Sequence, residues 1–222
     1  MKFIHIADVH WGMNPDSDRP WSRERAQAIR DSFAEVIRQA RLRDADCLFI
    51  SGDLFHRQPL LRDLKEVNYL FSTIPGVQVM IIAGNHDSGE RLEFARELLE
   101  KEGVFIAGLP PREAGEKIRK VAMTDPAGEV CFYLLPFTKP SHLRKKYEEE
   151  KIDSYEDAVK KLLEEEEIDT TKRNVLLSHQ FYLSSGSEPL TCDSEIRMAG
   201  GIDEIDTRLL EDIDYVALGH IH

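Results

Sequence analysis

Five short apolar segments of this chain each run directly into a polar cluster of aspartate, asparagine or histidine. The segments are residues 2–7, 47–51, 77–83, 174–178 and 215–219. The clusters that follow them are Asp8-Val9-His10, Gly52-Asp53, Gly84-Asn85-His86-Asp87, His179 and His220-Ile221-His222. Each segment has the length and composition of a buried strand, and ligand sites in open α/β sheets form where strands end. The pattern therefore predicts that one edge of the fold gathers these polar side chains.

Amphipathic helical stretches separate the predicted strands, which is typical of an α/β fold. The predicted helices are residues 22–43, 88–101 and 155–166. Ser88 is suited to cap the second helix, and Ser154 with Asp157 resembles a capping box for the third. Residues 104–107 add a further strand, and a hairpin through residues 117–135 predicts that the sheet is mixed.

The composition limits where the protein acts and what it binds. No uncharged apolar run approaches the roughly 18 residues of a membrane span, and the first run is too short for a signal peptide. Three widely spaced cysteines, Cys47, Cys131 and Cys192, form no disulfide framework or thiolate zinc motif, which favours the cytoplasm. The net charge of −12 disfavours a broad basic face, so any polyanion has to be bound locally.

The polar clusters offer oxygen and nitrogen donors without cysteine, a set that suits manganese, iron or zinc. The candidate ligands are Asp8, His10, Asp53, Asn85, His179, His220 and His222. Seven ligands exceed the needs of one tetrahedral ion, whereas two ions roughly 3.5–4 Å apart would use them all if one carboxylate, here Asp53, bridges both. Each cluster alone is more simply explained as a turn or a core histidine. Five of them at strand ends favour a metal centre, because burying so much charge without an ion is costly.

These motifs carry a family resemblance that spans nearly the whole chain. The order Asp-x-His, Gly-Asp, Gly-Asn-His-Asp, a later histidine and Gly-His-x-His resembles the calcineurin-like metallophosphoesterases. Within that superfamily, residues 3–8, 52–56 and 214–222 are similar to the SbcD-type subunits of DNA-repair nucleases. The resemblance implies a four-layer αββα sandwich of two mixed sheets flanked by helices, with a dinuclear and typically manganese centre.

The resemblance also implies a role for each motif residue. One ion would take Asp8, His10, Asp53 and His222, and the other would take Asp53, Asn85, His179 and His220. His86 would stabilise the transition state or protonate the leaving oxygen, with Asp87 orienting its ring. His56 matches an additional histidine that the nuclease branch keeps near the scissile phosphate; its alternative is a surface loop residue.

The leading hypothesis is a manganese-dependent DNA nuclease, both exonuclease and single-strand endonuclease, in double-strand-break or hairpin processing. The resemblance implies DNA as substrate, an SMC-like ATPase partner of the SbcC type and a homodimer. The dimer would use the stripe Leu61, Leu64, Val67, Leu70 and Phe71, although packing on the sheet explains that stripe more simply. The alternatives are a phosphoesterase for small phosphomonoesters or cyclic nucleotides, and a non-catalytic scaffold with a structural metal site.

No linker or internal repeat divides the chain, so residues 1–222 are predicted to form one nuclease domain. His222 lies three residues beyond a predicted strand, which is an unusual place for a domain to stop. We therefore expect the domain to be cut short before a C-terminal capping domain of the kind the nuclease branch carries.

Overall fold

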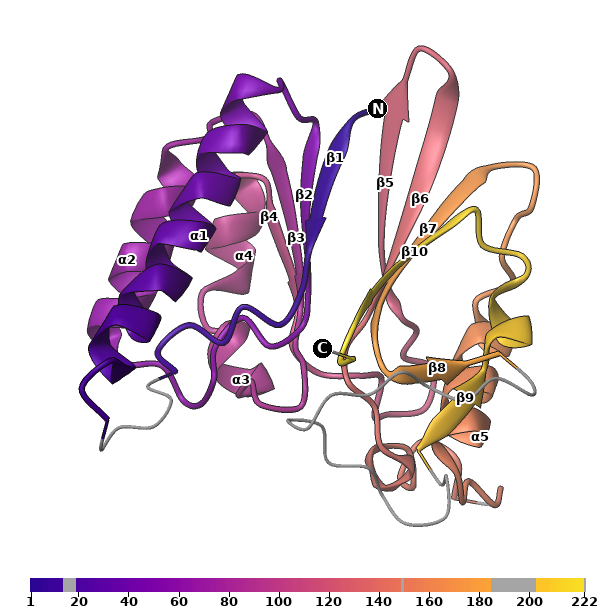
Figure 1. Cartoon of the computed structure of the whole chain (residues 1–222). Helices are drawn as coiled ribbons and strands as arrows, with labels where there is room; N and C mark the ends of the chain where they lie inside the picture. Colours follow the sequence, from indigo (N-terminus) through magenta and orange to yellow (C-terminus); the bar gives the residue numbers. More distant parts are fainter. Residues whose placement is uncertain (14–18, 149, 185–202, 222) are drawn as a thin grey trace.

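Two four-stranded sheets pack face to face with helices on their outer faces, as Figure 1 shows. The computed structural model describes residues 1–13, 19–148, 150–184 and 203–221. Strand order is β1-β2-β3-β4 in the first sheet and β10-β7-β6-β5 in the second. The four-layer αββα sandwich is therefore confirmed. Along the chain, the strands of the first sheet all precede those of the second.

All strand pairs of the first sheet are parallel, whereas the second sheet is mixed because β5 runs antiparallel to β6. The expectation of two mixed sheets thus holds for the second sheet only. The first sheet contains β1 (Phe3–Ile6), β2 (Cys47–Ser51), β3 (Gln78–Ile82) and β4 (Val104–Ala107). The second contains β5 (Arg119–Asp125), β6 (Gly128–Leu135), β7 (Arg173–His179) and β10 (Tyr215–Gly219). The predicted hairpin is the β5–β6 pair.

Three apolar clusters hold the layers together, and the middle one fills the space between the two sheets. There, Phe49 of β2 packs on Phe132 of β6 at a centroid distance of 5.6 Å. Outside the first sheet lie α1 (Ser22–Leu42) and α2 (Leu61–Ser72). Outside the second sheet lie α5 (Tyr155–Glu165), the 3-10 turns η1 (Pro140–His142) and η2 (Thr207–Leu210), and the ribbon β8 (Phe181–Leu183) with β9 (Glu204–Asp206).

The capping box predicted for the third helix is present at the start of α5. The Ser154 hydroxyl accepts from the Asp157 N–H at 3.0 Å, and the Asp157 carboxylate accepts from the Ser154 N–H at 3.0 Å. These two bonds satisfy donors that the first helical turn leaves without partners. The helix therefore begins at Tyr155, as its sequence predicts.

The single helix predicted for residues 88–101 is wrong, because two short helices take its place. They are α3 (Gly89–Leu92) and α4 (Arg96–Lys101), and Ala95 between them has a left-handed φ of 70°. Ser88 precedes α3 but makes no side-chain capping bond. The Glu93 carboxylate accepts instead from the Gly108 N–H at 2.9 Å, which ties the break to the loop after β4.

Candidate metal centre

The loops after β1 and β2 continue to pair beyond the end of the first sheet. The Asp8 N–H donates to the Gly52 carbonyl at 3.1 Å, and the His10 N–H donates to the Asp53 carbonyl at 2.8 Å. Further along, the His56 N–H donates to the carbonyl of Trp11 at 3.1 Å. This extended backbone pairing brings Asp8 and His10 beside Asp53, although more than forty positions separate the two motifs in the sequence.

The backbone at the candidate site is strained. Non-glycine residues rarely adopt positive φ, yet Asp8 (53°), His10 (49°), Asp53 (49°) and His220 (91°) all do so. They make up four of the seven non-glycine positions with positive φ in the described parts of the chain. Such conformations cost of order 1–3 kcal/mol each and concentrate at functional sites. The surrounding hydrogen bonds therefore hold these side chains in a costly arrangement.

Two glycines are needed because side chains from the two sheets approach their backbone closely. A Cβ at Gly84 would lie 2.0 Å from Asp53 Oδ1, and a Cβ at Gly52 would lie 2.1 Å from His179 Nδ1. No side chain fits at either distance, so the glycines of the Gly-Asp and Gly-Asn-His-Asp motifs make room for the carboxylate and the imidazole.

The donor atoms converge in two neighbouring groups. Donor atoms of Asp8, His10 and Asp53 all lie within 4.8 Å of one another, a spacing that can hold a metal ion. In the second group, Asn85 Oδ1 lies 3.1 Å from His179 Nε2 and 3.1 Å from His220 Nδ1.

Asp53 belongs to both groups. Its Oδ2 lies 3.8 Å from His10 Nε2 and 3.5 Å from His179 Nε2, and its side chain is only 2% exposed. A buried carboxylate between two donor groups suits a bridging ligand, and the purely oxygen and nitrogen donor set suits hard or borderline divalent cations. The residues present therefore fit a metal centre. His222, the remaining candidate ligand, lies outside the described residues.

Asp53 and His179 shift each other's pKa in opposite directions. Burial raises the pKa of the Asp53 carboxyl, but the bond and charge of His179, with help from the His86 N–H and His10, bring that pKa below its ordinary value. Burial lowers the pKa of His179, but Asp53 and the Ser51 carbonyl bring it above its ordinary value. Each group thus favours the charged form of the other, so the site favours positive charge beside Asp53.

A backbone carbonyl orients His179. The Nδ1–H of His179 donates to the Ser51 carbonyl at 2.7 Å, which turns Nε2 toward Asp53 and Asn85. This arrangement is the usual outer contact of a metal-binding histidine, because it fixes the tautomer and the ring plane.

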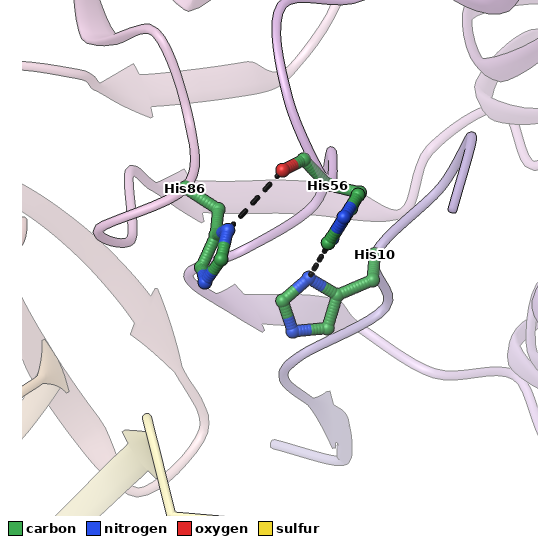
Figure 2. Close-up of side chains that lie close together, drawn as sticks. All are labelled: His10, His56 and His86. Carbon is green, nitrogen blue, oxygen red and sulfur yellow. Dashed lines mark hydrogen bonds between the residues drawn. The ribbon is translucent and has the colours of Figure 1, made fainter. Parts of the chain in front are cut away.

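Three histidines cluster on the His10 side of the site, as Figure 2 shows. His56 Nδ1 lies 3.4 Å from His10 Nδ1, and the His86 Nδ1–H donates to the His56 carbonyl at 3.2 Å. The rings of His56 and His86 stack with centroids 5.3 Å apart. Burial lowers the pKa of His56, and the charges of His86 and Arg57 lower it further, so a neutral ring is favoured at this position.

Asp87 has contacts other than those expected. Its carboxylate accepts from three backbone N–H groups, those of Gly84 (3.0 Å), Leu54 (3.2 Å) and Phe55 (2.8 Å), and not from the His86 ring. The His56 carbonyl orients that ring instead. Asp87 therefore ties the loop after β2 to the loop after β3. Burial raises the pKa of Asp87 to about 6 against the opposing effect of these donors.

Sequence reasoning missed Phe137, whose ring lies 5.5 Å from the ring of His220 and 6.3 Å from that of His179. No polar motif marks the segment after β6. Only its position at the end of a strand, next to Pro136, was a signal that it approaches the site.

The family model for calcineurin-like phosphoesterases matches residues 1–222, and the chain belongs to this family. The chain is 29% identical over 234 residues to the SbcD component of the SbcCD nuclease of Staphylococcus saprophyticus, and the alignment covers all of this chain and 56% of that relative. The chain thus spans about half the length of the curated relative that it matches. The resemblance to the calcineurin-like metallophosphoesterases and the similarity to an SbcD-type nuclease subunit are therefore both confirmed.

None of the helices in the described parts of the chain combines the length and the apolar composition that a membrane span requires.

Proposed function

We propose that the chain hydrolyses phosphodiester bonds of DNA with a pair of divalent ions, preferably manganese. Asp8, His10, Asp53 and His222 would hold one ion, while Asp53, Asn85, His179 and His220 would hold the other. The observation that carries this proposal is the position of the Asp53 carboxylate between the His10 and His179 imidazoles. Ions bound there would neutralise charge on the phosphate and lower the pKa of a bound water.

We propose that His86 protonates the leaving oxygen or stabilises the transition state. Its backbone N–H donates to Asp53 Oδ1 at 2.9 Å, while its ring is exposed and is oriented through Nδ1. The ring is thus held at the site by its neighbours and keeps its other nitrogen, Nε2, for the substrate.

His56 is proposed to act beside His86 at the scissile phosphate. Its neutral ring contacts His10, and its carbonyl orients His86, so it links a candidate ligand to the candidate acid. The role proposed for Asp87 is to keep the loops that carry Asp53 and His86 in register.

The choice of DNA as substrate and of an SMC-like ATPase as partner rests on the similarity to the nuclease component named above. On the same basis we propose exonuclease and single-strand endonuclease activity in double-strand-break or hairpin processing. A nuclease with a net charge of −12 must attract the strand at the site itself, and two divalent ions beside two aspartates would leave that site positive. We further propose a cytoplasmic location, which suits the buried free thiols of Cys47 and Cys131.

A homodimer is part of the proposal, but with a different face from the one expected. Four of the five apolar side chains in the α2 stripe pack against the core of the first sheet, leaving Leu61 outside. Leu61 is 68% exposed and Phe94, before α4, is 81% exposed. Leu61 follows Gln58 by three positions and Phe94 follows Arg91 by three, and with the Gln58 amide turned its oxygen accepts from the Arg91 guanidinium, so the two segments meet there. We propose that a second copy of the chain covers this apolar region.

The experiment that tests the proposed function offers the purified chain two substrates. One is a labelled hairpin or single-stranded DNA and the other is a chromogenic phosphomonoester, each with Mn²⁺, Mg²⁺ or a chelator. Cleavage of the DNA with Mn²⁺ and none with chelator is expected, with Asp53→Asn as the inactive control. Hydrolysis of the monoester alone would contradict the nuclease proposal.

A further inference from the structure

The segment that follows β6 is fixed to both sheets at the edge that carries the candidate metal centre. The Phe137 N–H donates to the Ala83 carbonyl at 2.8 Å, directly before the Gly-Asn-His-Asp loop. The Thr138 carbonyl accepts from Gln180 Nε2 at 3.0 Å, directly after His179. Thr138 itself is fully buried. These bonds hold residues 136–139 in one position relative to the two loops that carry Asn85 and His179.

The half-buried ring of Phe137 contacts the histidines of the second donor group and α5. It lies 5.5 Å from the His220 ring at 38° and 6.3 Å from the His179 ring at 82°. The Tyr155 ring contacts it at 6.0 Å. Because its neighbours come from three elements, the ring forms a fixed apolar surface beside the donor atoms of His179 and His220.

Lys139 lies over this surface. Its ammonium group is 5.6 Å from the centre of the Phe137 ring, within the range of a cation–π contact. Lys139 is exposed, and no carboxylate pairs with it among the residues that the structure describes. The neighbouring Lys145 and Lys151, by contrast, each pair with a carboxylate. In a chain with 41 acidic and 29 basic residues, an unpaired cation beside a hydrolytic site is available to bind an anion.

The separations fit a contact to a phosphate near the one that is cleaved. The ammonium lies 5.6 Å from the Phe137 ring and that ring lies 5.5 Å from His220. Lys139 is therefore within the span of about three nucleotides of His220, since each takes roughly 3.4 Å along a stacked strand. Small phosphoesters carry no phosphate at that distance.

We propose that Lys139, held over the Phe137 ring that packs on His220, binds a phosphate group within about three nucleotides of the scissile one and makes the site prefer a polynucleotide over a small phosphoester. The proposal rests on the proposed nuclease function and adds the residue that selects for strand length. Phe137 acts as a positioning residue, because it fixes the ammonium without reaching the substrate phosphate.

The test compares three variants with the wild-type chain in Mn²⁺: Lys139→Gln, Lys139→Arg and the control Lys101→Gln. Lys101 is exposed and ends α4, just before the amino end of β4, whereas the candidate site lies at the carboxyl ends of the strands. Its substitution changes the net charge by the same amount as Lys139→Gln does. One substrate is a single-stranded oligonucleotide and the other is bis(p-nitrophenyl) phosphate, a diester without a neighbouring phosphate. The constants kcat and KM are measured for both substrates over a range of salt concentrations.

Lys139→Gln is expected to raise KM for the oligonucleotide severalfold and to reduce the salt slope of kcat/KM by about 0.7, the value for one lost contact to a single strand. Its kinetics on the small diester should match the wild type, and Lys139→Arg should restore oligonucleotide cleavage. Equal effects of Lys139→Gln and Lys101→Gln, or equal losses on both substrates, would overturn the assignment of Lys139. A wild-type chain that hydrolyses the diester but not the oligonucleotide would overturn the nuclease proposal, and the inference with it.

Discussion

Asp53 Oδ2 lies 3.5 Å from His179 Nε2, although Asp53 follows a strand of the first sheet and His179 ends a strand of the second. This contact closes the sandwich at the edge where the candidate metal centre lies. A parallel ladder in each sheet fixes the two strand ends, and the hydrogen bond from His179 Nδ1 to the Ser51 carbonyl joins them. Geometry at this edge therefore depends on the packing of the two sheets as well as on the loops.

His86→Ala is expected to leave metal binding intact and to lower kcat by about 10²- to 10⁴-fold, the usual contribution of a general acid or base. The variant keeps the backbone N–H that donates to Asp53, and it removes only an exposed ring. Measurement of bound manganese and of single-turnover DNA cleavage separates the two effects. Loss of metal from this variant would mean that His86 is a ligand.

His56→Ala should slow DNA cleavage by about 10- to 100-fold, in the range seen for residues that support a metal ligand. The alanine retains the carbonyl that orients His86, whereas the contact to His10 Nδ1 is lost. Manganese content should change little. An unaltered cleavage rate would show that His56 is a surface residue with no part in the reaction.

Asp87 is expected to make the stability of the metal-free chain fall as pH rises from about 4 to about 6. Its pKa is raised from 3.8 to about 6, so in this window the folded chain binds the proton more tightly than the unfolded chain does. This contribution to the free energy of unfolding is fully present below about pH 4 and is lost as the pH rises through about 6. The total loss is up to about 3 kcal/mol.

The variant Asp87→Asn isolates this effect, because the amide does not titrate. Urea unfolding of both proteins, in chelator at pH 4, 5, 6 and 7, gives the difference in their free energies of unfolding. That difference should move in favour of the variant with rising pH. A difference independent of pH would mean that the folded chain does not hold Asp87 as a proton-binding group.

Leu61→Glu should dissociate the proposed homodimer with little effect on folding, since Leu61 is 68% exposed and substitutions at such positions usually cost less than about 0.5 kcal/mol. Sedimentation velocity measures the dissociation, and Asn68→Glu, an exposed position on the same helix, is the matched control. A wild-type chain that sediments as a monomer would contradict the proposed interface.

Much of the fold was predictable because each layer has a local signature. Short β-branched runs predict the strands, and the reciprocal bonds of Ser154 and Asp157 depend on neighbours three positions apart. The break at Ala95 was not predictable in the same way. It depends on Glu93 bonding to Gly108, fifteen positions away, and on the close approach of Gly89 to Gly108. Residue spacing carries no signal for such a contact.

The same distinction between local and long-range signals holds for the candidate site. The motifs that follow the strands identified the residues that converge, since strand ends meet at one edge. The partners of Asp87, the orientation of His86 by a carbonyl, and the position of Phe137 beside His220 all depend on how separate loops pack. The ligand set itself stays a prediction, and so does the capping domain expected after residue 222.

The most direct test of the central claim is anomalous X-ray diffraction from crystals of the chain grown in saturating Mn²⁺. The proposal predicts two anomalous peaks roughly 3.5–4 Å apart with the Asp53 carboxylate between them, one beside His10 and the other beside His179 and His220. A single peak, no peak, or a pair of ions bound by other residues would contradict it.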